Sequence, residues 1–92
     1  MQDPLPSVTA AIEAVDEELQ AHKAGHGHVS NPPQLTKFRQ TLESMKHQIE
    51  SNAVPPRAQR LTGMGRVIAD SWPFDSELAA LILEAERRYL RM

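Results

Sequence analysis

The chain has 92 residues, of which 40% are hydrophobic and 24% charged, so we expect one globular domain spanning residues 1–92. It contains no cysteine, which excludes a disulfide-stabilised fold and a thiolate metal centre. It has neither an apolar run long enough to cross a bilayer nor a signal-peptide pattern. We therefore expect a cytoplasmic protein with no membrane partner.

The charge is unevenly distributed along the chain. The first fifty residues carry seven acidic and four basic side chains, a net charge of −3. The remaining residues carry five acidic side chains and six arginines, a net charge of +1. Because nucleic acid requires a basic binding face, the acidic first half argues against a nucleic-acid partner.

The seven prolines divide the chain into helical segments. Proline is tolerated in the first turn of a helix and disfavours helical backbone in the residue before it, so each proline cluster should separate two helices. Between the clusters, apolar residues recur at steps of three and four. This spacing predicts an all-α fold, a compact bundle of four short helices. The predicted helices span roughly residues 6–24, 33–51, 56–72 and 76–90.

The first two predicted helices have regular apolar stripes. The stripe of helix 6–24 consists of Val8, Ile12, Val15 and Leu19. The stripe of helix 33–51 consists of Leu35, Phe38, Leu42, Met45 and Ile49. Gly25 is expected to end the first helix, and Asn31 is expected to cap the second.

The last two predicted helices are less regular. The stripe of helix 56–72 consists of Ala58, Leu61, Gly65, Ile68 and Trp72. The stripe of helix 76–90 consists of Leu78, Leu81, Ile82, Ala85 and Tyr89. We expect Asp75 or Ser76 to cap the fourth helix, with Phe74 packing back on its first turn. Gly65 should allow a close helix crossing, whereas Gly63 should face outward within helix 56–72.

Four acidic residues form one candidate binding surface on helix 6–24. Helical geometry points Glu13 and Glu17 away from the apolar stripe, whereas Asp16 and Glu18 flank it. This acidic face could bind a basic patch on a partner, or it could be an ordinary solvated helix face. A paired-carboxylate hydrolase is disfavoured because an exposed helix face provides no water-excluding cleft.

Two leucines of the last helix form a second candidate surface. Leu83 and Leu90 lie off the stripe of helix 76–90, and Ala79 shares their side. A bundle of this size has little core with which to cover a second apolar edge. The leucine pair therefore indicates either contact with a protein partner, including a second copy of the chain, or burial by N-terminal residues such as Leu5.

A short run of histidines resembles a metal-ligand cluster. His22, His26 and His28 could together hold Zn²⁺ with an open fourth position. They lie on a glycine-rich loop that offers no obvious groups to orient them, and His22 suits the dipole at the end of a helix. We therefore expect a solvated loop, and no metal or other cofactor.

The segment from Arg60 to Leu81 resembles a known family. The matching residues are Arg60-Leu61-Thr62, Met64-Gly65, Val67-Ile68-Ala69 and Trp72, followed by Asp75-Ser76-Glu77-Leu78. They are similar to the Gly-x-Ile-Ala stretch and the Asp-Pro-Glu-Leu helix start of small all-α immunity proteins. Bacteria pair those proteins with type VI-secreted toxins, in particular with effectors of the NAD(P)⁺ glycohydrolase type. The resemblance implies a non-catalytic protein whose partner is a cognate toxin.

The resemblance is consistent with the charge pattern. A toxin that binds NAD⁺ or another nucleotide is expected to have a basic cleft, which an acidic inhibitor surface could occupy. Two alternatives stay open. One is a helical adaptor or homodimeric scaffold. The other is an all-α chorismate mutase, suggested by residues 10–20, although that chemistry needs an arginine on the first helix, where only Lys23 is basic.

Overall fold

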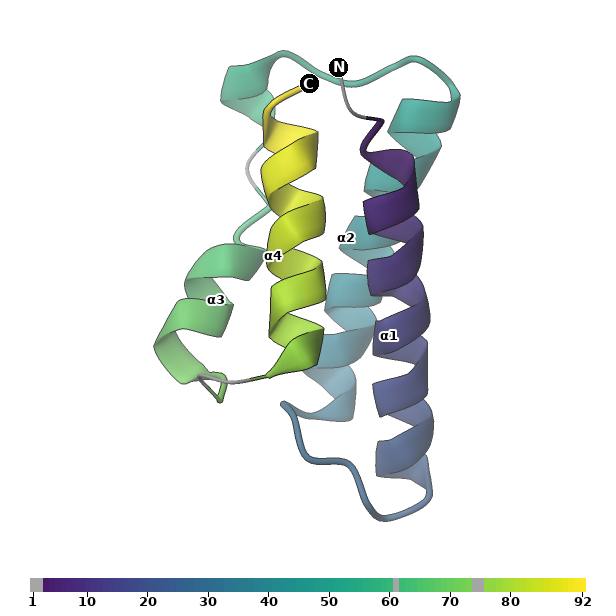
Figure 1. Cartoon of the computed structure of the whole chain (residues 1–92), viewed down its shortest axis with the longest axis vertical. Coiled ribbons are helices and arrows are strands. Elements are labelled where there is room, and N and C mark those ends of the chain that lie inside the picture. Colours follow the sequence, from purple (N-terminus) through teal and green to yellow (C-terminus); the bar gives the residue numbers. More distant parts are fainter. Residues whose placement is uncertain (1–2, 61, 74–75) are drawn as a thin grey trace.

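The computed structural model describes residues 3–60, 62–73 and 76–92. In these residues the chain forms helices α1 (Leu5–Lys23), α2 (Pro32–Glu50), α3 (Met64–Ser71) and α4 (Glu77–Leu90), with a short 3₁₀ turn, η1 (Arg57–Gln59) (Figure 1). The described residues contain no strand, which confirms the predicted all-α fold with four helices.

Three long helices form the body of the molecule (Figure 1). α1 packs against both α2 and α4, and the short α3 packs on α4. α2 runs antiparallel to α1, so the loop between them lies at one end of the bundle, and the described ends of the chain lie together at the other end. The bundle measures 39 × 24 × 21 Å. None of the described helices combines the length and apolar character needed to cross a membrane.

Three helices begin within one residue of the predicted bounds, and side-chain caps explain the starts of α2 and α4. The Asn31 side chain accepts a hydrogen bond from the Gln34 amide at 3.0 Å, as predicted for the cap of α2. The Ser76 hydroxyl accepts one from the Ala79 amide at 3.1 Å and caps α4. α1 begins one residue before Pro6, and the Asp3 carboxylate accepts a hydrogen bond from the Leu5 amide at 3.0 Å just ahead of it.

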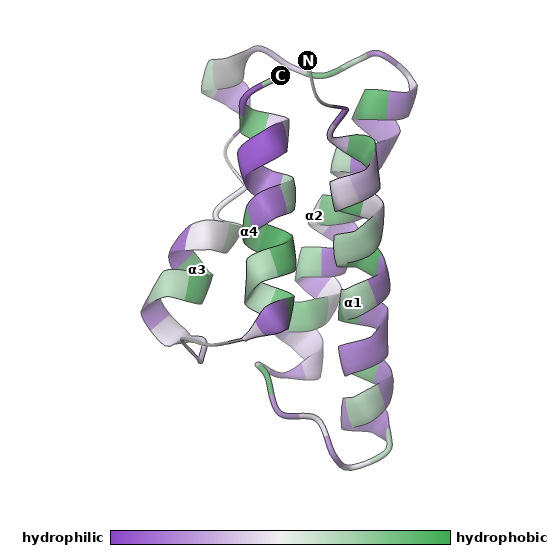
Figure 2. Ribbon diagram, viewed as in Figure 1, coloured by the Kyte–Doolittle hydropathy of each residue, from purple (hydrophilic) through white to green (hydrophobic). Residues whose placement is uncertain are grey.

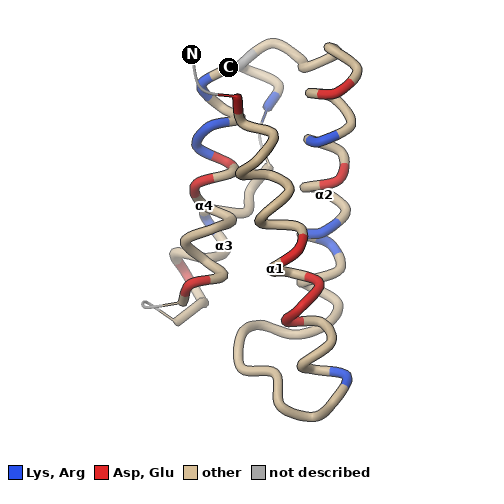
Figure 3. Tube along the Cα trace, turned by 45° about the vertical axis from the view of Figure 1, so that its right-hand side comes forward, with Lys and Arg blue, Asp and Glu red and all other residues tan. Residues whose placement is uncertain are grey.

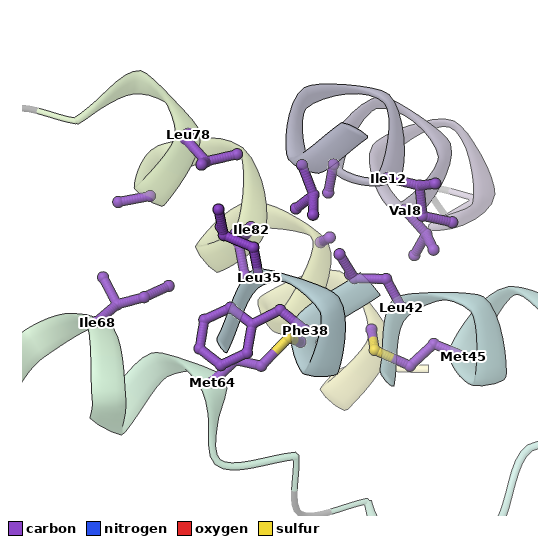
Figure 4. Packing of buried hydrophobic residues seen from close by; sticks show 14 of the residues in the cluster. Val8, Ile12, Leu35, Phe38, Leu42, Met45, Met64, Ile68, Leu78 and Ile82 are labelled. Carbon is purple, nitrogen blue, oxygen red and sulfur yellow. The ribbon is translucent and has the colours of Figure 1, made fainter. Parts of the chain in front are cut away.

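The core lies between α1, α2 and α4, and α3 closes one side of it (Figure 4). Its largest fully buried side chains are Leu35, Leu42, Met45, Met64, Ile82, Val8 and Val15. The Trp72 ring at the end of α3 stacks on Phe38 of α2, with ring centroids 5.5 Å apart, and its indole N–H donates to Gln34 Oε1. Trp72 therefore joins α3 to α2, and its predicted packing role is confirmed.

The prediction of one continuous third helix over residues 56–72 is wrong in its first part. The structure has only η1 in its first part, and α3 begins at Met64. Gly63 has φ +75°, a left-handed conformation that ends helical geometry, so it precedes α3 instead of lying within it. Ala58 is consequently exposed and lies outside the core, whereas Ile68 is buried as expected.

The close crossing predicted at Gly65 is confirmed. A Cβ atom built at Gly65 meets the Glu86 carboxylate and the Leu83 side chain, both on α4. Glu86 also accepts hydrogen bonds from the Gly65 amide, at 3.3 Å, and from the Thr62 hydroxyl. Since Gly63 provides no side-chain cap, a carboxylate from a different helix satisfies the amino end of α3.

The buried face of α4 differs from the predicted stripe at two positions. Leu81 is 40% exposed, whereas Ala79, expected off the stripe, is 6% exposed. Because α3 packs beside α4, the buried face extends toward Ala79 and leaves Leu81 outside. Figure 2 shows that the first half of α4 is largely hydrophobic and its last turns hydrophilic. The expectations for Leu61, Phe74 and Asp75 lie outside the described residues.

Candidate functional site

The acidic residues of α1 divide into two kinds. Glu13 and Glu17 are exposed, and Asp16 and Glu18 are partly buried beside the core, as helical geometry predicts. Figure 3 shows acidic residues gathered on the second half of α1, with another acidic position at the start of α4. The side chains of Glu13, Glu17 and Glu77 form no ion pair with any residue that the structure describes.

Asp16 is engaged within the bundle. Its carboxylate accepts a hydrogen bond from Arg39 Nε at 2.6 Å, and Arg39 also approaches Glu43 at 3.4 Å. The hydrogen bond from Arg39 to Asp16 raises the pKa of the guanidinium. This pair joins α1 to α2, and because both side chains are well exposed it contributes about 1 kcal/mol at most.

Glu18 organises the loop between α1 and α2. Its Oε2 atom accepts hydrogen bonds from the backbone amides of His28 and Val29, both at 2.8 Å. Burial raises the pKa of Glu18, but the two amide hydrogen bonds and the neighbouring His22 outweigh it, so the pKa lies below its ordinary value. The amide hydrogen bonds from the loop therefore stabilise the ionised form of the Glu18 carboxylate.

His22 completes this arrangement. Its Nε2 atom lies 2.8 Å from the Val29 carbonyl oxygen, which can only accept, so Nε2 carries the proton. The same atom is 3.4 Å from Glu18 Oε2. A Cβ atom built at Gly27 collides with the His22 ring, so this ring lies directly against the backbone of the loop. We call Glu18, His22 and their contacts to residues 27–29 the loop clasp.

The clasp corrects, for His22, the expectation that the loop offers no groups to orient the histidines. His22 has fixed partners, whereas His26 and His28 have exposed side chains. Within residues 3–60, 62–73 and 76–92, no group of three or more His, Cys, Asp or Glu side chains is placed to hold a metal ion. The three histidines lie close together in the sequence. In the structure, however, the His22 side chain contacts the backbone of the loop.

A groove of about 370 Å³ combines acidic and apolar groups beside the clasp. It lies between the second half of α1, the α1–α2 loop and the start of α4. Its lining residues are Ala14, Glu17, Glu18, His28, Val29, Ser76, Glu77, Leu78 and Leu81. We call this the acidic groove. Sequence reasoning identified Glu17 and Glu18 but missed Glu77 and Leu81, because only the packing of α4 on α1 places them together.

The two leucines predicted as a second surface have different environments. Leu83 is 40% exposed and lines an apolar groove of about 440 Å³ between α3 and α4. Leu90 is partly buried and packs against the core, so the two do not form one exposed edge. Of the two alternatives for this pair, exposure to a partner is open to Leu83, whereas Leu90 is largely covered by the bundle itself.

Three arginines gather at the opposite end of the molecule. Arg87, Arg88 and Arg91 line a hollow of about 480 Å³ near the described chain ends, together with Asp3 and Glu84. Arg88 Nε donates to Glu84 at 2.6 Å, and Arg87 also pairs with Glu84. The hydrogen bond from Arg88, with that from Arg87, lowers the pKa of Glu84. The arginines at the end of α4 therefore lie at the opposite end of the bundle from the acidic groove.

Arg60, in the connection between η1 and α3, has a structural role. Its Nε donates to the Pro55 carbonyl at 2.6 Å, and its Nη1 donates to the carbonyls of Tyr89 and Met92 at 3.2 and 2.9 Å. A cation at the end of α4 is also favoured by the helix dipole. Arg60 therefore fastens the α2–α3 connection to the end of α4.

No model of a known protein family matches the chain. No curated protein matches it either.

Proposed function

We propose that this chain is a cytoplasmic immunity protein. It binds a cognate interbacterial toxin and blocks the toxin's nucleotide- or NAD-binding active site without catalysing a reaction itself. The observation that carries the proposal is the acidic groove, where Glu17 and Glu77, which form no ion pair among the described residues, line the same hollow as the exposed Leu81. The resemblance of residues 60–81 to immunity proteins supports the same assignment.

Charge complementarity supports the choice of partner. A cleft that binds a phosphorylated nucleotide presents basic groups, and an acidic surface is steered toward it during diffusional encounter. Glu13 and Glu17 extend this acidic surface along one face of α1. A stable complex needs about 800 Å² on each side, which α1, the loop and the start of α4 can jointly supply.

The apolar part of the groove supports protein binding over a purely ionic contact. Exposed ion pairs contribute about 1 kcal/mol or less each, so charges alone give specificity and rate more than affinity. Leu81 provides an apolar side chain at the same place as the carboxylates, and Ala14 and Val29 line the groove beside it. Interfaces commonly combine such an apolar centre with a charged rim.

Co-expression with the product of the neighbouring gene tests the proposal. We expect the two proteins to co-purify, and the chain to rescue cells that the gene product alone kills. The Glu17→Lys/Glu77→Lys variant should lose both properties, because it reverses the charge of the acidic groove. The matched control is Glu50→Lys, an exposed position at the far end of α2. Absence of both binding and rescue by the unmodified chain would refute the proposal.

A homodimeric scaffold is the second candidate, and the groove between α3 and α4 favours it. This groove is lined by Ile68, Ala69, Trp72, Pro73, Ser76, Ala79, Ala80 and Leu83. All of these except Ser76 are apolar or aromatic, which suits contact with another protein surface. Light scattering during size-exclusion chromatography distinguishes the candidates: a dimer that the Leu83→Glu variant dissociates favours the scaffold, and a monomer favours the immunity protein.

A further inference from the structure

The α1–α2 loop provides one wall of the acidic groove, through His28 and Val29. The loop has no helix or strand of its own over residues 26–31. Its position there depends on side chains of α1, since Glu18 accepts the amide hydrogen bonds of His28 and Val29. His22 donates to the carbonyl of Val29, so both polar backbone groups of this residue are held by α1.

We propose that Glu18 and His22 are positioning residues that fix the shape of the acidic groove by holding residues 27–29 through the loop clasp. This inference rests on the proposed function for its biological meaning. Glu17 and Glu77 face the partner, whereas Glu18 and His22 act through the loop. The clasp thus separates the four acidic residues of α1 into groups with different roles.

Gly27 provides an unusually specific test of the clasp. Its φ lies outside the left-handed region, so alanine is compatible with its backbone, but a Cβ there collides with the His22 ring. Gly25 is the matched control, because it has φ +87° and nothing within 4 Å of a Cβ built there. Alanine at Gly25 therefore strains the backbone whether or not His22 is present.

Amide hydrogen exchange and thermal unfolding should be measured for His22→Ala, Gly27→Ala and the double variant. We expect each single change to speed exchange at the Val29 amide about tenfold, because each disturbs the bond from His22 to the Val29 carbonyl and so loosens the loop that Glu18 holds. The double variant should be no worse than His22→Ala, because the collision disappears with the ring. In contrast, Gly25→Ala should add its full effect to that of His22→Ala.

The effect on the groove is measured by the methyl resonances of Leu81 and by affinity for the co-purified toxin. The clasp variants should shift these resonances. They should also weaken toxin binding about tenfold, the same factor by which they are expected to speed exchange at the Val29 amide. Glu17→Gln should weaken binding while leaving Val29 exchange unchanged. Additive effects of His22→Ala and Gly27→Ala, or unchanged Leu81 resonances, overturn the inference. If no toxin binds, the proposed function fails, while exchange and methyl data still decide whether the clasp shapes the groove.

Discussion

Leu42 of α2 belongs to the hydrophobic core, and its side chain is fully buried. Truncating such a side chain removes its buried apolar surface and leaves a cavity that the bundle fills only in part. We expect Leu42→Ala to lower the free energy of unfolding by about 3 kcal/mol, measured by urea denaturation. Leu83→Ala, at a 40% exposed position, should cost less than 1 kcal/mol. Equal losses in the two variants would contradict the described core.

The clasp makes part of the stability depend on pH. The pKa of Glu18 is lower in the folded chain than its ordinary value of 4.5, so its ionised form stabilises the fold. This contribution is complete above pH 4.5 and is lost as the pH falls through the lowered pKa. We therefore expect the stability difference between the unmodified chain and Glu18→Gln to be constant near neutral pH and to shrink below pH 4.5. Urea denaturation across this range measures it, and a difference that grows on acidification would contradict the clasp.

At the scale of single residues, local roles were predictable and long-range ones were not. Asn31 follows a recognisable capping pattern, since its side chain bonds an amide only three residues away. The partners of Glu18 lie ten and eleven residues along the chain, beyond a loop whose path the sequence does not specify. The sequence therefore grouped Glu18 with the other carboxylates of the candidate acidic face and gave no sign of its contacts to the loop.

At the scale of elements, α3 depends most on its surroundings. It has only eight residues, too few for a stable isolated helix, and Gly63 gives it no side-chain cap. The prediction of a continuous helix over 56–72 is wrong because the spacing of apolar residues does not reveal that Gly63 has a positive φ. Glu86 of α4 supplies the missing cap, a contact that no local pattern indicates.

The dependence of α3 on Glu86 gives a direct prediction. Glu86→Ala removes the acceptor for the Gly65 amide and the Thr62 hydroxyl, so we expect a loss of about 1 kcal/mol, the usual effect of losing a helix cap. Amide exchange at Gly65 should become faster at the same time. Glu50→Ala, at an exposed position on α2, should change neither quantity. Unchanged exchange at Gly65 in Glu86→Ala would show that the cap has no role in holding α3.

At the scale of the whole molecule, the position of the charged groups predicts how a partner associates. The carboxylates of the acidic groove lie at the loop end and the arginines of the last turns of α4 lie at the other end, so we expect a basic partner to be steered toward the groove. We expect the association rate with the toxin to fall steeply as salt increases, measured by stopped-flow fluorescence. Glu17→Gln/Glu77→Gln should reduce both the rate at low salt and its salt dependence. Glu50→Gln should behave like the unmodified chain, and a salt dependence that survives in the groove variant would place the contact elsewhere.

The helical body was predictable from sequence because three long stripes bury their faces against one another. α1, α2 and α4 begin and end close to their predicted bounds, and Val8, Leu35 and Ile82 lie in the core as their spacing requires. The acidic groove was only half predictable. Glu17 stands on one helix and can be read from its period, whereas Leu81 joins it through the packing of α4 on α1.

The central claim is that the acidic groove is the surface that binds another protein. Hydrogen exchange of the full chain, alone and with the co-purified toxin, tests this most directly. We predict new protection at residues 14–18, 28–29 and 77–81, with residues 87–91 unchanged. Protection confined to the arginine-rich end of α4, or to the groove between α3 and α4, would contradict the account.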